Sequence, residues 1–289
     1  MLQEQLIDFS LWQSFFEAEF AQLALICTLL VGALCGLLSP TIVLKQRAYI
    51  GDTLSHLVFP GLVAGYFAAA AFNLPLWSAM MFGAVVTGLV GSFAVERLER
   101  LLNLPPDSAA VLTLTGFFAA GVVAVSRLRG TRLDLERFLF GDVLNLTVQD
   151  ALVLAVVLIL IGALLLILRK DWDAWLSDAE FARLMGFRVR LIEKLFPIVV
   201  TAAVLTGLVA VGGLMISALL TVPAALLPPK SALSLRALAF STLLALVGLL
   251  AAFALDWPVG STIVLVGFVL VLTKAIVVSL AQRSTAAKD

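Results

Sequence analysis

Long apolar segments recur along this chain, and they limit the folds open to it more than any other feature. About 20 consecutive apolar residues span the hydrocarbon core of a bilayer as a helix. The chain is 62% hydrophobic and only 13% charged, whereas soluble domains are nearer half apolar and a quarter charged. The sequence therefore predicts an all-α, polytopic membrane protein. Seven segments are long enough to cross a membrane: 20–44, 53–72, 76–95, 109–126, 151–168, 237–255 and 259–280.

The block 195–229 needs separate treatment, because it holds no ionised side chain over 35 residues. One continuous helix of that length would be roughly 50 Å long, too long for a bilayer core of about 30 Å. Gly212 and Gly213 divide the block. We therefore expect two membrane segments, 195–211 and 212–229, the second being either a ninth crossing or a partly inserted helix. The prediction is eight or nine membrane helices.

Basic residues indicate the orientation, since cytoplasmic loops of membrane proteins are enriched in Lys and Arg. Fifteen of the 19 bases fall on one side if the chain starts outside and ends in the cytoplasm. Lys274, inside the last segment, is expected to extend its amine to that interface. The inside bases lie at Lys274, in the C-terminal tail and in the loops near 45–52, 96–108, 169–194 and 228–236. The other four lie in one outer loop: Arg127, Arg129, Arg132 and Arg137.

The ends of the chain differ from its apolar middle. In residues 1–19 apolar side chains recur at three- and four-residue spacing, which predicts an amphipathic helix lying in the membrane interface. Residues 20–280 form a single predicted transmembrane domain, and 281–289 a cytoplasmic tail. Lys plus Arg and Asp plus Glu number 19 each, so no overall basic field indicates nucleic acid as a partner.

The longest polar insertion on the inside, 169–194, predicts a short amphipathic helix. Ser177 to Glu180 has the Ser-x-x-Glu form of a capping box, and Gly186 suits the end of a helix. Between them Phe181, Leu184 and Met185 form an apolar stripe. Such a helix either rests on lipid headgroups or docks into a groove of a soluble partner.

Asp52 and His56 form the most notable polar pair of the apolar segments. His56 is the only histidine, and residues four apart lie on one face of a helix about 5–6 Å apart. A carboxylate and an imidazole can together bind a divalent transition metal. An acid at mid-depth costs roughly 2.5–3.5 kcal/mol, which indicates a function. The alternative is that Asp52 caps the helix while His56 bonds a neighbouring carbonyl.

Several stretches together resemble the permease subunit of bacterial metal ABC importers, the family that handles zinc, manganese or iron(II). The resemblance runs from about Ala24 to Leu280 with the stretches in the family's order. Those stretches are Gly51 to His56 with Pro60-Gly61, Phe140 to Leu144, Asp178 to Gly186, Val211 to Ala225, and Asp256 to Leu265.

The resemblance implies roles for individual residues. Asp52 and His56 match the positions that bind the metal in transit. Asp107 aligns with an acidic residue of the family, although Ser108-Ala109 replaces the family's Ile-Gly pair and helix capping would also explain it. The coupling helix that contacts the ATPase would comprise Ser177, Asp178, Glu180, Phe181, Leu184, Met185 and Gly186.

The resemblance also implies partners and a location. They are a second copy forming a homodimeric pore, a cytoplasmic ATP-binding subunit and an extracytoplasmic metal-binding protein, in the bacterial inner membrane. No G-x-x-x-x-G-K-[ST] occurs, so we expect a transport subunit and not an enzyme. The metal would be substrate, with no resident cofactor, and carboxylate plus imidazole suits Zn, Mn and Fe alike.

Three alternatives stay open from the sequence. The first is an importer of a metal chelate or another small solute, with a wider pore and a structural His56. The second is a proton-coupled secondary transporter that uses Asp52 and His56 as a relay. A membrane-embedded metalloenzyme is disfavoured, because one histidine and no H-E-x-x-H supply too few ligands.

Overall fold

The computed structural model describes residues 19–127, 146–227 and 231–286, which form helices joined by short connections, with no strand among them. Predictions for 1–18, for Arg129, Arg132 and Arg137, for Phe140 to Leu144 and for 287–289 fall outside these ranges. The helices are α3 (Glu19–Leu44), α4 (Ile50–Leu57), α5 (Phe59–Phe72), α6 (Leu76–Leu102), α7 (Pro106–Val125), α9 (Val148–Ile167), α10 (Arg169–Ser177), α11 (Ala179–Leu184), α12 (Val189–Val211), α13 (Gly213–Leu226), α14 (Leu235–Leu255) and α15 (Val259–Ala286).

Eight helical spans in the described ranges are long and apolar enough to cross a membrane, with α4 and α5 counted together as one span. α13 is apolar but has only 14 residues, about 21 Å at 1.5 Å per residue. The all-helical class with eight or nine membrane helices is therefore confirmed. The predicted division of the chain into an interfacial segment 1–19, a transmembrane domain 20–280 and a cytoplasmic tail 281–289 stays a prediction.

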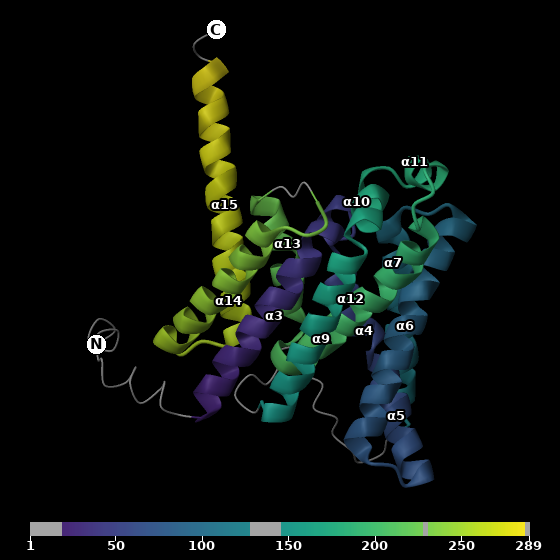
Figure 1. Cartoon of the computed structure of the whole chain (residues 1–289). Coiled ribbons are helices and arrows are strands. Elements are labelled where there is room, and N and C mark those ends of the chain that lie inside the picture. Colours follow the sequence, from purple (N-terminus) through teal and green to yellow (C-terminus); the bar gives the residue numbers. More distant parts are fainter. Residues whose placement is uncertain (1–18, 128–145, 228–230, 287–289) are drawn as a thin grey trace.

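Helix α3 forms the centre of the bundle, packed against α9, α12, α13 and α14. Its fully buried residues include Leu34, Leu38 and Ile42. The helix starts at one end of the molecule and finishes near α10 and α11 at the other, where the C-terminus also lies (Figure 1). The described chain thus begins and ends on opposite sides, as the predicted orientation requires.

Close backbone packing joins α5 to α6. Gly61 and Gly65 form a G-x-x-x-G pair on α5, a pattern that lets membrane helices approach closely. A Cβ atom on Gly61 would overlap the Gly83 carbonyl and the Thr87 hydroxyl of α6. A Cβ on Gly65 would overlap the Ala79 carbonyl. The absence of side chains at these two positions therefore fixes the distance between α5 and α6.

Helices α12 and α13 form a sharp hairpin. Gly212 adopts φ +84° between them, a conformation that favours glycine, and the predicted division of block 195–229 is confirmed. At the far end of α13, the amine of Lys274 donates to the carbonyls of Ala225 (3.0 Å) and Leu226 (2.8 Å). Lys274 thus caps the C-terminus of α13 from α15, where a cation is favourable, and does not simply extend to the interface as expected.

Helix α10 anchors the polar insertion to the bundle. The fully buried Trp172 donates from Nε1 to Thr41 of α3 (3.1 Å). The Lys45 amine, just past α3, donates to the Trp175 carbonyl (2.9 Å) and lies over its ring, 4.0 Å from the centroid. Burial lowers the pKa of Lys45, with a further contribution from Arg47. The insertion therefore sits on a rigid base.

Candidate functional site

Helix α4 carries Asp52 and His56 on one face, as the four-residue spacing predicts. Asp52 Oδ1 lies 3.8 Å from His56 Nε2, and the side chains are 61% and 30% exposed. The capping alternative for Asp52 is wrong, because the helix begins at Ile50 with Tyr49 in the N-cap position. Asp52 stands inside the first turn, so its carboxylate is available to a ligand on the open face of α4.

The chain breaks its helix directly after His56. Pro60 has no N–H to donate to the His56 carbonyl four residues earlier, and its ring would clash with that carbonyl. The helix is interrupted at Val58, between α4 and α5. The pair therefore lies on a short helix that is separated from α5 by a kink.

An aromatic contact from α7 holds the imidazole. The Phe118 ring meets the His56 ring edge to face, with centroids 5.7 Å apart at 89°. Phe118 also packs on Phe59, with centroids 5.5 Å apart. The described contacts of the His56 side chain are with Phe118 and Asp52, and they do not include the neighbouring carbonyl expected in the alternative, structural role.

Helix α13 lies against the other side of α4. Gly213 packs on the Ser55 side chain, and Gly51 packs on Ser217, so the two helices run antiparallel. Ser217 and Thr221 are half-buried and follow each other along α13, and each donates to a carbonyl one turn back. Both hydroxyls therefore bond within α13, and Ser217 lies at its contact with Gly51 of α4.

One copy of the chain supplies too few ligands for a transition metal. No group of three or more His, Cys, Asp and Glu side chains that could hold a metal occurs among the described residues. Asp107 lies in the first turn of α7, eleven residues before Phe118, which is about 16 Å along a helix. The structure therefore brings Asp52 and His56 together and leaves Asp107 apart.

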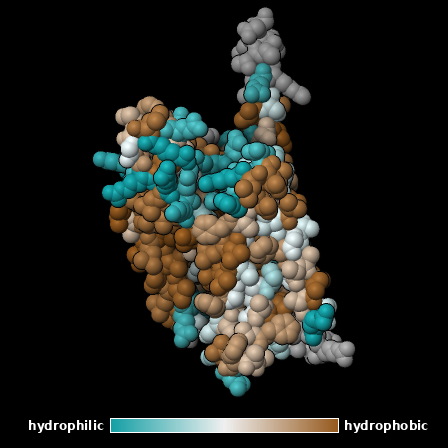
Figure 2. All heavy atoms as spheres, turned by 90° about the vertical axis from the view of Figure 1, so that its right-hand side faces the viewer, coloured by the Kyte–Doolittle hydropathy of each residue, from teal (hydrophilic) through white to brown (hydrophobic). Residues whose placement is uncertain are grey.

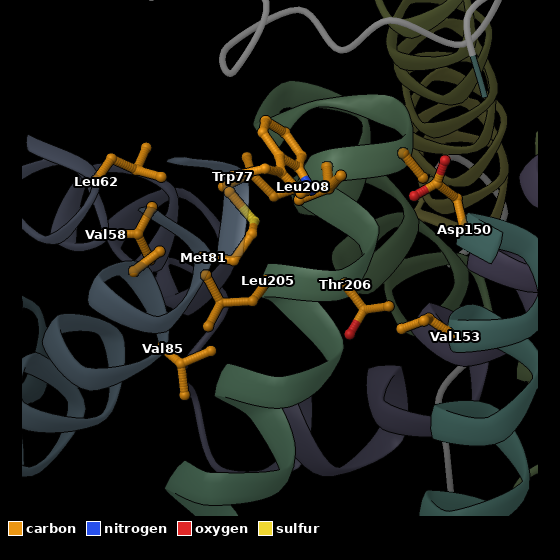
Figure 3. A pocket seen from close by; sticks show the side chains of 13 residues that line it. Val58, Leu62, Trp77, Met81, Val85, Asp150, Val153, Leu205, Thr206 and Leu208 are labelled. Carbon is orange, nitrogen blue, oxygen red and sulfur yellow. The ribbon is translucent and has the colours of Figure 1, made fainter. Parts of the chain in front are cut away.

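A separate cavity of about 260 Å³ lies between α5, α6, α9 and α12 (Figure 3). Its wall is mostly apolar, with Leu62, Met81 and Leu205 among its side chains, and Asp150 at one edge. The Asp150 carboxylate already accepts from the backbone and hydroxyl of Thr147 in a capping box. Neither Asp52 nor His56 lines this cavity, and its chemistry does not suit a metal ion.

The predicted coupling segment forms helix α11, with one correction at its start. The N-cap is Asp178, whose Oδ1 accepts from the backbone N–H groups of Glu180 and Phe181. Ser177 instead ends α10 and donates to the Asp173 carbonyl. The predicted capping box at Ser177 is wrong, because a carboxylate one residue later accepts from two N–H groups at once.

The end of α11 matches the prediction. Gly186 has φ +83°, and its N–H donates to the Arg183 carbonyl, while that of Phe187 donates to the Ala182 carbonyl. This is a Schellman motif. The predicted apolar stripe is exposed: Phe181 by 60%, Leu184 by 86% and Met185 by 63%.

Glu193 links α11 to the bundle, a role the sequence did not indicate. Its carboxylate accepts from Arg183 of α11 at 2.5 Å and lies 3.9 Å from Arg100 of α6. Phe118 and Ser217 are likewise missing from the sequence prediction. Each becomes important only through a contact across a long sequence separation, so no local pattern indicates it.

Eight apolar spans, a half-length helix beside a polar pair, and an exposed amphipathic helix at the basic end define a multi-pass permease of the bacterial inner membrane. The ABC 3 transport family matches residues 17–278. The chain belongs to this family, and the resemblance to metal-type ABC permeases is confirmed. Its members are transport components, not enzymes.

Known proteins support the same family. The chain is 33% identical to the "Probable metal transport system membrane protein" of Thermotoga maritima over 264 aligned residues. This alignment covers 90% of each of the two chains. It is 29% identical over 219 residues to the "Manganese transport system membrane protein MntC" of Bacillus subtilis, covering 74% of this chain but only 49% of that protein. Further relatives are named for iron or zinc transport.

A solved structure supports the fold. The structure "PsaBC from Streptococcus pneumoniae in complex with Fab" has a TM-score of 0.76 at 24% identity and covers 94% of this chain and 95% of that one. At this identity the similarity shows the arrangement of the helices alone.

Proposed function

We propose that this chain is the permease subunit of an ATP-driven importer that moves a divalent transition-metal ion into the cell. The observation that carries the proposal is the Asp52–His56 pair, 3.8 Å apart on the open face of α4. A half-buried imidazole beside an exposed carboxylate on a membrane helix suits a metal in transit better than a structural role.

The pore in this proposal lies between two copies of the chain. Two ligands do not complete a coordination sphere, and a twofold arrangement would bring a second carboxylate and imidazole to the ion. Water would supply further oxygens. Imidazole favours Zn²⁺, Mn²⁺ or Fe²⁺ over Mg²⁺ and Ca²⁺. A site with so few permanent ligands also releases its ion readily.

Two further partners complete the proposed cycle. An extracytoplasmic metal-binding protein would deliver the ion, and a separate ATPase would dock on α11 and supply the energy. Asp107 lies in the first turn of α7, at an end of the bundle that the predicted orientation places on the cytoplasmic side. We assign it to the route by which the ion leaves, and not to the pair itself.

The test is ATP hydrolysis by the permease reconstituted in vesicles with the ATPase subunit and the binding protein. We expect stimulation by Zn²⁺, Mn²⁺ or Fe²⁺ and none by Mg²⁺ beyond the nucleotide requirement. Stimulation by a metal chelate alone would favour the chelate importer. Uptake without the ATPase, driven by a proton gradient, would show a secondary transporter and refute the proposal.

The exposed stripe of α11 gives a second prediction. Replacing Leu184 by asparagine removes an apolar side chain of the kind that anchors a helix in a partner's groove, worth about 1–2 kcal/mol. Metal-stimulated ATP hydrolysis at limiting ATPase subunit should fall about fivefold. Leu235→Asn is the matched control, because Leu235 of α14 is also strongly exposed, by 74%, and this variant should keep its rate. Equal rates in both variants would remove α11 from the docking surface.

A further inference from the structure

A charged pocket lies at the end of the bundle that carries α11. It has a volume of about 480 Å³ and is lined by residues of α6, α11 and α12. Its volume exceeds that of a single phosphate group, and it opens at the molecular surface. The residues that line it are Phe93, Glu96, Arg100, Arg183, Arg190, Glu193 and Lys194.

The pocket carries an excess of positive charge. Four bases face two carboxylates, which leaves two positive charges unmatched. Glu193 is already shared by Arg183 and Arg100. Arg190 and Lys194 make no ion pair with any residue that the structure describes. These two bases are exposed, lie one helical turn apart on α12, and are therefore free to bind an anion.

The pocket lies where the apolar wall of the molecule ends. Along α6 the exposed side chains Val86, Val90 and Phe93 lead up to it. Phe93 is seven residues from Arg100, about 10 Å along the helix. Figure 2 shows the corresponding change, with hydrophilic side chains gathered directly above a broad apolar surface. A ligand that suits both parts has an anionic head and an apolar tail.

We propose that this pocket binds an anionic phospholipid of the inner leaflet. The phosphate lies between Arg190 and Lys194, where the guanidinium can donate two parallel hydrogen bonds. An acyl chain follows Val90 and Phe93 along α6. Basic pockets between helices on the cytoplasmic side of a membrane are suited to such headgroups. The proposal rests on the membrane placement of the bundle and is independent of the transported substrate.

The test is lipid binding to the full-length chain in detergent micelles, followed by native mass spectrometry during titration with phosphatidylglycerol or phosphatidylcholine. The variant Arg190→Gln/Lys194→Gln removes the two unpaired bases. Its affinity for phosphatidylglycerol should fall about 10- to 30-fold, as expected for two bases at a headgroup surface. Its weak binding of phosphatidylcholine should not change.

The matched control is Arg97→Gln/Arg236→Gln, which removes two exposed bases that do not line the pocket. It should bind phosphatidylglycerol within twofold of the unmodified chain. An equal loss in both variants would show general surface attraction and overturn the site. Displacement of the lipid by millimolar inorganic phosphate would make the ligand a free anion. Unchanged lipid binding with weaker retention of the ATPase subunit would assign the pocket to a protein carboxylate; both results overturn the proposal.

Discussion

Replacing Asp52 by asparagine, or His56 by glutamine, is expected to reduce metal uptake to background while leaving the fold intact. Asparagine keeps the shape of Asp52 but removes the charge that attracts a cation, and glutamine removes the imidazole. Mutating even a residue that only hydrogen-bonds to a metal ligand lowers the affinity for the metal by about 10–100-fold. With two ligands per chain, either change should cost at least that much.

Uptake of radioactive or fluorescence-detected metal into vesicles measures this effect at matched protein levels. Asp256→Asn is the control, because Asp256 ends α14 with φ +54°, a conformation that asparagine adopts easily. Its uptake should equal that of the unmodified chain. Near-normal transport by both Asp52→Asn and His56→Gln would exclude the pair as the route of the ion.

Gly61→Ala is expected to destabilise the bundle by about 3 kcal/mol or more. The added methyl group would overlap the Gly83 carbonyl and the Thr87 hydroxyl of α6. A backbone carbonyl cannot move aside as a flexible side chain can, so α5 must separate from α6, and overpacking of this kind costs 1–3 kcal/mol or more. Since α4 continues into α5, the displacement would also move Asp52 and His56.

Thermal unfolding of the purified chain in detergent measures the change in stability. Gly116→Ala on α7 is the control, because a Cβ there meets nothing within 4 Å. This second variant should be neutral or slightly more stable, since alanine favours a helix over glycine. Equal unfolding temperatures for the two variants would contradict the close packing of α5 on α6.

Most of the fold follows from hydropathy and glycine. The apolar runs predict the spans, and the excess length of block 195–229 with Gly212 predicts the hairpin that the structure contains. The sequence places the start of the second span at residue 53, whereas the helix begins at Ile50. The difference arises because a polar residue such as Asp52 is typical of the N-cap position, which would place the first helical residue at Thr53.

The candidate site is less predictable. Four-residue spacing is enough to place Asp52 beside His56, since that geometry is local to one helix. The ring of Phe118 is 62 positions from His56, and the carboxylate of Glu193 is ten positions from Arg183. Both contacts depend on how the helices pack. Nothing in the local sequence distinguishes Phe118 from the other phenylalanines of its apolar run, or Glu193 from the other acidic residues of its charged segment.

The half-length of α13 has an electrostatic consequence for the pair. Because this helix begins at Gly213, which packs on the Ser55 side chain, its unpaired N–H groups lie where α13 meets α4, the helix that carries the pair. The start of a helix carries about half a positive charge. We infer that this partial charge opposes a cation held by Asp52 and keeps the ion's residence brief.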